Sequence, residues 1–219
     1  MTEAIVLDLG GVILDLDIEG CKERFRRGGI TDIDRMVDAC HHQGIFKDLE
    51  SGRITDVEFC KRMSEMSGGR MTPREVHDVF DTMCARVPEK KIRQILEFKK
   101  QYPVYCLSNN NAISVRWFQD RIEEMGVTIY DLFDDIFCSY RLRMIKPERD
   151  IFDYAVKKIG LPAGNLLFID DSPKNVEVAK DAGMDAVLYE LGSDLGELIS
   201  SRLSPALSQP QPRQAEAGE

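Results

Sequence analysis

The amino-acid sequence predicts an α/β fold, in which a parallel β-sheet is covered by helices on both faces. Short, continuous apolar runs alternate with amphipathic helical segments, which is the pattern of strands that are buried on both sides. The candidate strands cover residues 4–9, 104–107, 136–138, 166–169 and 186–189. At 219 residues, the chain is long enough for one such core with a substantial insertion.

Proline and glycine mark the ends of the helices expected between these strands. The expected helices cover 88–101, 112–125 and 148–159, followed by a helix that has Ser172 as its cap, Pro173 at its first position and Gly183 past its end. Pro88 opens the first of them, and Gly126 and Gly160 follow the next two. Proline suits the first turn of a helix and glycine the position after its end.

The stretch 16–87 differs from the rest, because it contains helix starts and no convincing strand. Thr55 and Thr72 each begin a capping-box pattern, with a glutamate three residues later. A connection in such a fold has about 2–6 residues. We therefore expect 16–87 to be an inserted all-helical cap domain, placed where a lid would close over the strand ends.

The remaining residues complete the domain prediction and set bounds on function. Residues 1–15 and 88–200 form the core, and the Pro-, Gln- and Ser-rich tail 201–219 is expected to be disordered. A net charge of −9 without a long basic patch argues against nucleic acid and anionic membranes as partners. The N-terminus has no basic region before its short apolar run, so we expect a cytoplasmic protein. The six cysteines form no CxxC pair and are expected to be reduced thiols.

Residues capable of chemistry follow the candidate strands, and in open parallel sheets ligands bind at this edge. They are Asp8 after the first strand, Ser108 and Asn109 after the second, Lys146 in the loop beyond the third, and Asp170 with Asp171 after the fourth. Each alone is more often a turn former, a helix cap or a solvated lysine. Their combination in this order indicates an active site.

The acidic groups among them predict a metal ion. Asp8 and the pair Asp170–Asp171 would repel one another, and a hard divalent cation such as Mg²⁺ would relieve the repulsion. Mg²⁺ would also neutralise a phosphate while Asp8 attacks it as a nucleophile. Lys146 and the Ser108 hydroxyl would hold the transferring oxygens.

Four segments resemble the signatures of the haloacid dehalogenase superfamily, and the resemblance covers about residues 4–195. They are Asp8-Leu-Gly-Gly-Val-Ile, Leu107-Ser-Asn, Ile145-Lys-Pro and Phe168-Ile-Asp-Asp-Ser. The resemblance implies a Rossmann-like core with a helical cap. It also implies that Asp8 is the nucleophile and a metal ligand, that the Gly10 main-chain oxygen and Asp170 or Asp171 are further ligands, and that Ser108, Asn109 and Lys146 surround the phosphate.

Residues 50–59 resemble a cap segment of small-molecule phosphatases in this superfamily, most similar to the bacterial α-D-glucose-1-phosphate phosphatase type. One position departs from the common pattern. Most phosphatases of the superfamily carry a second Asp two residues after the nucleophile, as general acid and base, whereas this chain has Gly10. Asp15 is not an evident replacement. Without an acid, substrates with a good leaving group, such as sugar 1-phosphates, are expected to react best.

We therefore expect a Mg²⁺-dependent phosphatase that acts on a small phosphorylated metabolite through an aspartyl-phosphate. The alternatives are a metal-independent dehalogenase-type hydrolase, which also lacks the second Asp, and a non-catalytic binding protein on the same fold. The acidic pair argues against the dehalogenase. His41 and His42 are expected to be exposed, Phe46 to belong to the cap core, and Trp117 to be a packing residue. The sequence does not predict an oligomeric state.

Overall fold

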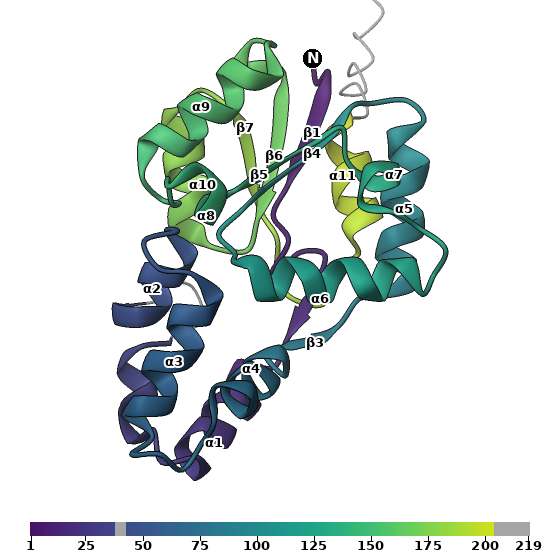
Figure 1. The fold of residues 1–219 in the computed structure, drawn as a ribbon. Helices are drawn as coiled ribbons and strands as arrows, with labels where there is room; N and C mark the ends of the chain where they lie inside the picture. Colours follow the sequence, from purple (N-terminus) through teal and green to yellow (C-terminus); the bar gives the residue numbers. More distant parts are fainter. Residues whose placement is uncertain (38–42, 204–219) are drawn as a thin grey trace, which may run out of the picture.

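The computed structural model describes residues 1–37 and 43–203, and its centre is a five-stranded parallel sheet (Figure 1). The strand order is β5-β4-β1-β6-β7. The bounds are Ala4–Leu7 for β1, Val104–Ser108 for β4, Asp135–Cys138 for β5, Leu166–Asp170 for β6 and Asp185–Leu188 for β7. Each expected strand is present within a few residues of its expected bounds, so the predicted fold class is confirmed.

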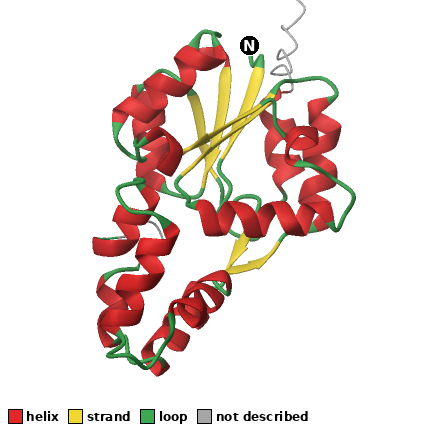
Figure 2. Cartoon of the chain, viewed as in Figure 1, coloured by secondary structure: helices red, strands yellow, loops and turns green. Residues whose placement is uncertain are grey.

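Helices cover both faces of the sheet because alternate strand residues point to opposite sides (Figures 1 and 2). Ile5 and Leu7 of β1 pack in one buried cluster, whereas Ala4 and Val6 pack in another. The first cluster lies under α5 (Glu89–Lys99), α6 (Ala112–Glu123), α7 (Ile129–Leu132) and α11 (Leu195–Leu203). The second lies under α9 (Arg149–Ile159) and α10 (Pro173–Asp181), and the short α8 (Ser139–Leu142) adds Leu142.

Most residues of the insertion between β1 and α5 lie in helices. These are α1 (Ile18–Arg27), a 3₁₀ turn (Thr31–Arg35), α2 (Gly44–Glu50), α3 (Asp56–Met66) and α4 (Pro73–Asp81). The capping box expected at Thr72 is complete, because Thr72 and Glu75 each accept from the other's main-chain N–H. At Thr55 only one of the two bonds forms: the Thr55 side chain accepts from the Glu58 N–H, whereas the Glu58 carboxylate accepts from Arg62.

Aromatic side chains hold the insertion together in a hydrophobic cluster that also includes Ile113 of α6. The ring of Phe46 lies 5.0 Å from that of Phe59 and 5.8 Å from that of Phe80, and all three are buried. Phe25 contacts the same group. Phe46 is therefore a core residue of the insertion, as predicted.

The expectation that 16–87 contains no strand is wrong. Asp15–Leu16 (β2) and Cys84–Arg86 (β3) form a two-stranded antiparallel ribbon. The strands are too short for an apolar pattern to reveal them. An ion pair of 2.7 Å between Asp15 and Arg86 and a hydrogen bond of 2.8 Å from Asp17 N to Met83 O hold them together. The two chain segments that connect the insertion to the sheet thus run side by side.

Other expectations concern the ends and the surface. Helix α11 includes residues 201–203, which the sequence assigned to the tail, whereas 204–219, Cys40, His41 and His42 lie outside the described residues. The other five cysteines are free and buried. Trp117 packs against the core cluster, as predicted.

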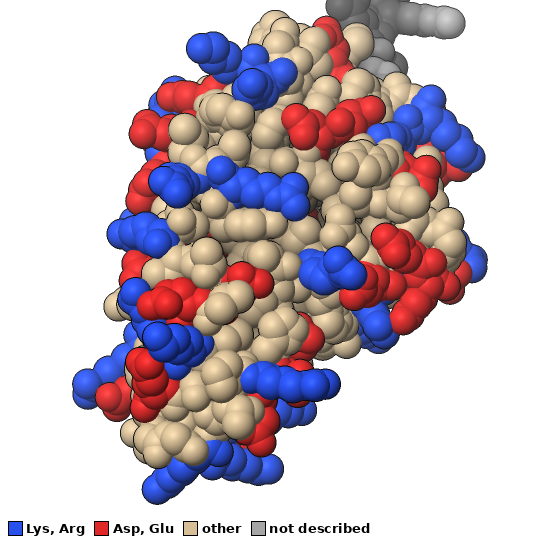
Figure 3. All heavy atoms as spheres, viewed as in Figure 1, with Lys and Arg blue, Asp and Glu red and all other residues tan. Residues whose placement is uncertain are grey.

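On the face seen in Figure 3, lysines and arginines lie among acidic residues. Among the described helices, none has the length and apolarity that a membrane span requires.

The packing of Phe59 generates a testable prediction. Phe59→Ala should lower the free energy of unfolding by about 3–5 kcal/mol, because it leaves a cavity among Phe46, Phe80 and Met63. Phe59→Leu should cost clearly less, since it keeps most of the volume. Urea denaturation followed by circular dichroism measures both, and equal stability of Phe59→Ala and the parent protein would contradict this packing.

Candidate active site

The residues predicted from the sequence meet at the carboxyl-terminal edge of the sheet. Asp8 follows β1, Ser108 ends β4 and Asp170 ends β6, while Lys146 comes from the loop between α8 and α9. A cavity of about 80 Å³ lies here. The lining residues from the sheet edge are Asp8, Gly10, Asn109, Lys146, Asp171, Ser172 and Asn175. Those from the insertion and its connections are Leu16, Ile18, Glu50 and Met83. Ser108 and Asp170 are buried behind this lining.

The ammonium group of Lys146 lies at the centre of the site, and its side chain is fully buried. Its Nζ lies 2.6 Å from Asp170 Oδ2 and 3.0 Å from Asp8 Oδ1, and it donates to Leu107 O at 2.9 Å. Burial opposes the charged ammonium, but the carboxylates of Asp170 and Asp8 hold the pKa of Lys146 above its usual value. Lys146 therefore carries a positive charge between two carboxylates.

Burial and neighbouring negative charges disfavour the ionised form of the carboxylates that face the cavity. Burial raises the pKa of Asp8 to about 7; Lys146 and a hydrogen bond from Ser108 oppose this, whereas Asp170 and Asp171 add to it. Burial and the neighbouring Asp170 raise the pKa of Asp171 to about 6. The predicted mutual repulsion is therefore present, and one lysine does not neutralise it.

Two side chains hold the site in place. The side-chain amide of Asn109 makes two hydrogen bonds with the main chain of Lys146. Asn109 Nδ2 donates to the Lys146 carbonyl oxygen, and Asn109 Oδ1 accepts from the Lys146 N–H, each at 2.8 Å. Asp170 accepts from Lys146, from the Ser172 N–H at 2.8 Å and from Asn175 Nδ2 at 2.9 Å. Asn109 thus positions Lys146, and Asp170 ties the lysine to the start of α10.

A divalent cation fits the donor set of this edge. One carboxylate oxygen each from Asp8, Asp170 and Asp171 lie within 4.8 Å of one another. Ser172 and Asn175 line the cavity, and their buried atoms Ser172 Oγ and Asn175 Oδ1 have no hydrogen-bond partner among the described residues. Oxygen ligands together with polar atoms that can bind water suit Mg²⁺. Ser172 is the N-cap residue of α10 and Pro173 follows in its first turn, as predicted, although the Ser172 hydroxyl makes no cap hydrogen bond.

Gly11 is a site residue that the sequence did not single out. Its φ of +77° is one that side chains with a Cβ rarely adopt, and a Cβ there would lie 2.0 Å from Asp171 Oδ2. The neighbouring Gly10 has no positive φ, and the nearest atom to a Cβ would be Leu16 Cδ1 at 3.4 Å. Gly11, and not Gly10, is therefore the position where only glycine fits.

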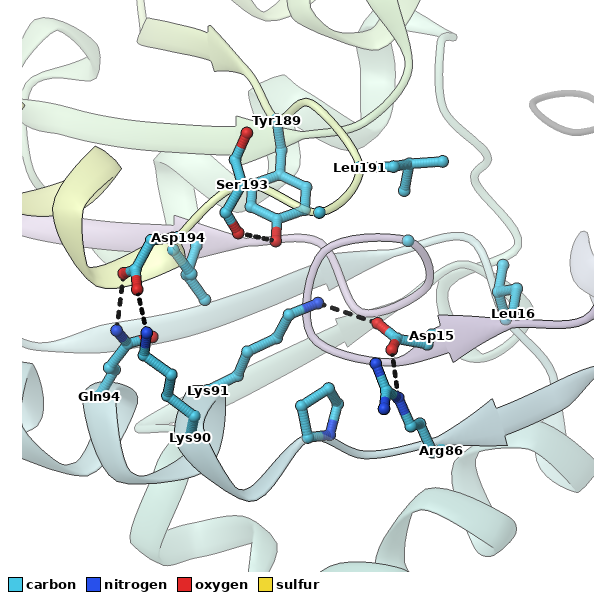
Figure 4. Close-up of a pocket in the computed structure, with 14 residues that line it drawn as sticks. Asp15, Leu16, Arg86, Lys90, Lys91, Gln94, Tyr189, Leu191, Ser193 and Asp194 are labelled. Atoms are coloured by element: carbon cyan, nitrogen blue, oxygen red, sulfur yellow. Dashed lines mark hydrogen bonds and ion pairs between the residues drawn. The ribbon is translucent and has the colours of Figure 1, made fainter.

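Asp15 does not take the place of the second Asp that Gly10 lacks. Its carboxylate binds Arg86 at 2.7 Å and Lys91 at 3.1 Å, and Asp15 lines another cavity, of about 490 Å³, which does not include Asp8 (Figure 4). Partial burial opposes ionisation, but these two cations hold the pKa of Asp15 below its usual value. Asp15 is thus an ionised carboxylate of the connecting ribbon.

Comparison with known proteins identifies the family of the chain. Residues 73–183 match the model of the haloacid dehalogenase-like hydrolases. D-ribitol-5-phosphate phosphatase from Bacteroides thetaiotaomicron is 32% identical over 195 residues, which cover 89% of this chain and 95% of the relative. The chain therefore belongs to the haloacid dehalogenase-like hydrolase family.

Two further similarities concern phosphate chemistry. Sesquiterpene phosphatase from Aspergillus oryzae is 31% identical over 83% of this chain and 87% of its own. The crystal structure of a family enzyme from B. thetaiotaomicron, in complex with magnesium and inorganic phosphate, superimposes with a TM-score of 0.84 at 30% identity, and covers 90% of this chain and 99% of its own. The similarity to the glucose-1-phosphate phosphatase type stays a prediction.

The two adjacent glycines allow a matched test. Gly11→Ala should lower turnover by about 10²-fold, because a displacement of Asp171 by about 1 Å misplaces the reacting groups. Gly10→Ala should keep most of the activity, since it meets only a flexible leucine. Phosphate release from the purified variants, with melting temperatures as a check of folding, measures both effects, and equal activities would refute the distinction.

The charge on Asp8 predicts a dependence of stability on pH. Folding raises the pKa of Asp8 from 3.8 to about 7. Protonation of Asp8 therefore stabilises the folded state in full below the unfolded pKa, and this stabilisation is lost as the pH rises through the folded pKa. Metal-free Asp8→Asn should therefore be more stable than the metal-free parent at pH 8, by on the order of a few kcal/mol. The difference should shrink toward pH 4. Thermal unfolding in a chelator measures it, and an Asp8→Asn variant less stable at pH 8 would contradict it.

Proposed function

We propose that the chain is a Mg²⁺-dependent phosphatase that hydrolyses the phosphate ester of a small sugar or polyol through Asp8. The observation that carries the proposal is the convergence of Asp8, Asp170 and Asp171 within 4.8 Å beside the buried cation Lys146, at a cavity between the sheet edge and the insertion. The carboxylates would hold the metal ion together with the Gly10 main-chain oxygen. When bound, Mg²⁺ supplies positive charge that shields the phosphate from the attacking carboxylate.

The reaction proceeds in two displacements at phosphorus. A carboxylate oxygen of Asp8 attacks, the bond from phosphorus to the ester oxygen breaks, and the alcohol leaves. Water then attacks the aspartyl-phosphate, the bond to Asp8 breaks, and inorganic phosphate is released. Lys146 and the Ser108 hydroxyl stabilise charge on the transferring oxygens, and Asn109 keeps Lys146 in place.

The size and lining of the cavity support a small substrate. Its volume is about 80 Å³, and Ile18, Glu50 and Met83 close it from the side of the insertion. We propose that residues 16–87 act as a cap domain that opens to admit the substrate and selects it by contacts to the part that leaves. D-ribitol-5-phosphate phosphatase, at 32% identity, supports a phosphorylated polyol or sugar as the substrate class.

Phosphate release from a panel of sugar and polyol phosphates tests this function. The parent protein should release phosphate with Mg²⁺, lose the activity in excess chelator and regain it when Mg²⁺ is restored. Ca²⁺ should restore it poorly, because its looser coordination misplaces the reacting groups. Asp8→Asn should fold and show essentially no turnover, since an amide is not a nucleophile.

Two results would overturn the proposal. Full hydrolysis of 2-haloacids in chelator, without phosphatase activity, would identify the dehalogenase-type alternative. Binding of phosphorylated metabolites without any turnover would identify a binding protein. Gly10→Ala serves as the control for Asp8→Asn, because it changes the same loop without changing its charge.

A further inference from the structure

The proposed reaction has a gap at Gly10, because an alcohol that leaves as an alkoxide needs a proton. A general acid contributes about 10²–10⁴-fold when the leaving group is poor. Gly10 carries no ionisable group, and Asp15 is paired with Arg86 and Lys91 outside this cavity. Among the described residues, we therefore look for the donor in the other groups that line the cavity.

Among the described residues lining the cavity, four side chains can exchange a proton, and three already have other roles. Asp8 is the nucleophile, Asp171 belongs to the carboxylate cluster, and Lys146 is held in its charged form by two carboxylates. The fourth is Glu50, the last residue of α2 in the insertion. Glu50 is outside the cluster of carboxylates that converge within 4.8 Å, so the metal site does not use it.

The position of Glu50 is fixed by a hydrogen-bond network at the junction of insertion and core. Ser139 is fully buried, and its hydroxyl donates to the Glu50 carbonyl oxygen at 2.6 Å. The same hydroxyl accepts from the Asn110 N–H at 3.0 Å. Asn110 follows Asn109 directly after β4, so this network ties the main chain of Glu50 to the loop that positions Lys146. Glu50 itself is only 9% exposed.

On this basis we propose that Glu50 is the general acid and base that replaces the missing aspartate, which rests on the proposed function. In the first step the protonated Glu50 carboxyl gives its proton to the ester oxygen as the bond to phosphorus breaks, and the alcohol leaves neutral. In the second step the Glu50 carboxylate takes a proton from the attacking water. Glu50 ends protonated, Asp8 ends ionised, and the net reaction is hydrolysis of the ester.

This assignment changes the expected range of substrates. A preference for sugar 1-phosphates follows from a site without a proton donor, since an anomeric oxygen leaves easily. With Glu50 as donor, esters of ordinary primary alcohols are substrates too. The insertion then contributes to the reaction itself as well as to selection, because its helix α2 supplies the acid.

The test compares two substrates that differ in their need for a proton. Ribitol 5-phosphate has an alkoxide leaving group, whereas p-nitrophenyl phosphate has one that needs no acid. Glu50→Gln should lower kcat/KM by about 10²–10⁴-fold on ribitol 5-phosphate and leave it nearly unchanged on p-nitrophenyl phosphate. The comparison uses kcat/KM because it reports only the steps through formation of the aspartyl-phosphate. A burst of nitrophenol should appear, since the second step loses its base.

A second variant tests the role directly. Gly10→Asp, which the backbone accepts, should restore kcat/KM on ribitol 5-phosphate in the Glu50→Gln background. Glu65→Gln, the same change at an exposed site of α3, is the control and should have no effect. Equal losses on both substrates, no loss on either, or a loss that Gly10→Asp leaves unchanged would overturn the role of Glu50. If the parent protein hydrolyses neither substrate, it is the proposed function that fails.

Discussion

The site depends on one buried cation. Lys146 contacts Asp8 and Asp170 and donates to the last residues of β4 through Leu107 O. Taking a lysine and two carboxylates out of water costs free energy, which is offset only when each charge keeps its partners. Removal of Lys146 leaves both carboxylates without their cation, whereas removal of Asp8 leaves Lys146 paired with Asp170. Asn109 holds the lysine from one side, and Ser172 and Asn175 hold Asp170 from the other. The carboxyl ends of separate strands are thereby joined into one charged centre. Its excess of negative charge favours the binding of a metal ion.

The sequence predicted those parts of the molecule that follow from periodicity and from the ends of strands. Apolar runs of four or five residues are unmistakable when both faces of a sheet are buried, so β1 and β6 were found with their acidic ends. The direction of each side chain beyond those ends was not predictable. Asn109 was expected at the phosphate and also serves the main chain of Lys146, which is 37 residues away in the sequence. No local pattern records such a partner.

Other features were missed for different physical reasons. The ribbon of β2 and β3 is held by pairing between segments about 70 residues apart, and each strand is too short to show alternation. Ser172 is the N-cap of α10 as its sequence context predicts, but the sequence does not show that its buried hydroxyl makes no cap hydrogen bond. Glu50 was placed only within residues 50–59, by their resemblance to a cap segment of small-molecule phosphatases. Only the folded chain brings it to the strand ends, through Ser139, which is 89 residues further along.

The paired connection of the insertion has a consequence for how such proteins diversify. Asp17 N and Met83 O are hydrogen bonded at 2.8 Å, so the residues between them leave and re-enter the core at almost the same point. A longer or shorter segment between them therefore adds little to the free energy of closing the connection, because the entropy of closing a loop grows only slowly with its length. A lineage can exchange this module, and with it the chemistry offered to the leaving group, while the buried charges beneath it stay untouched.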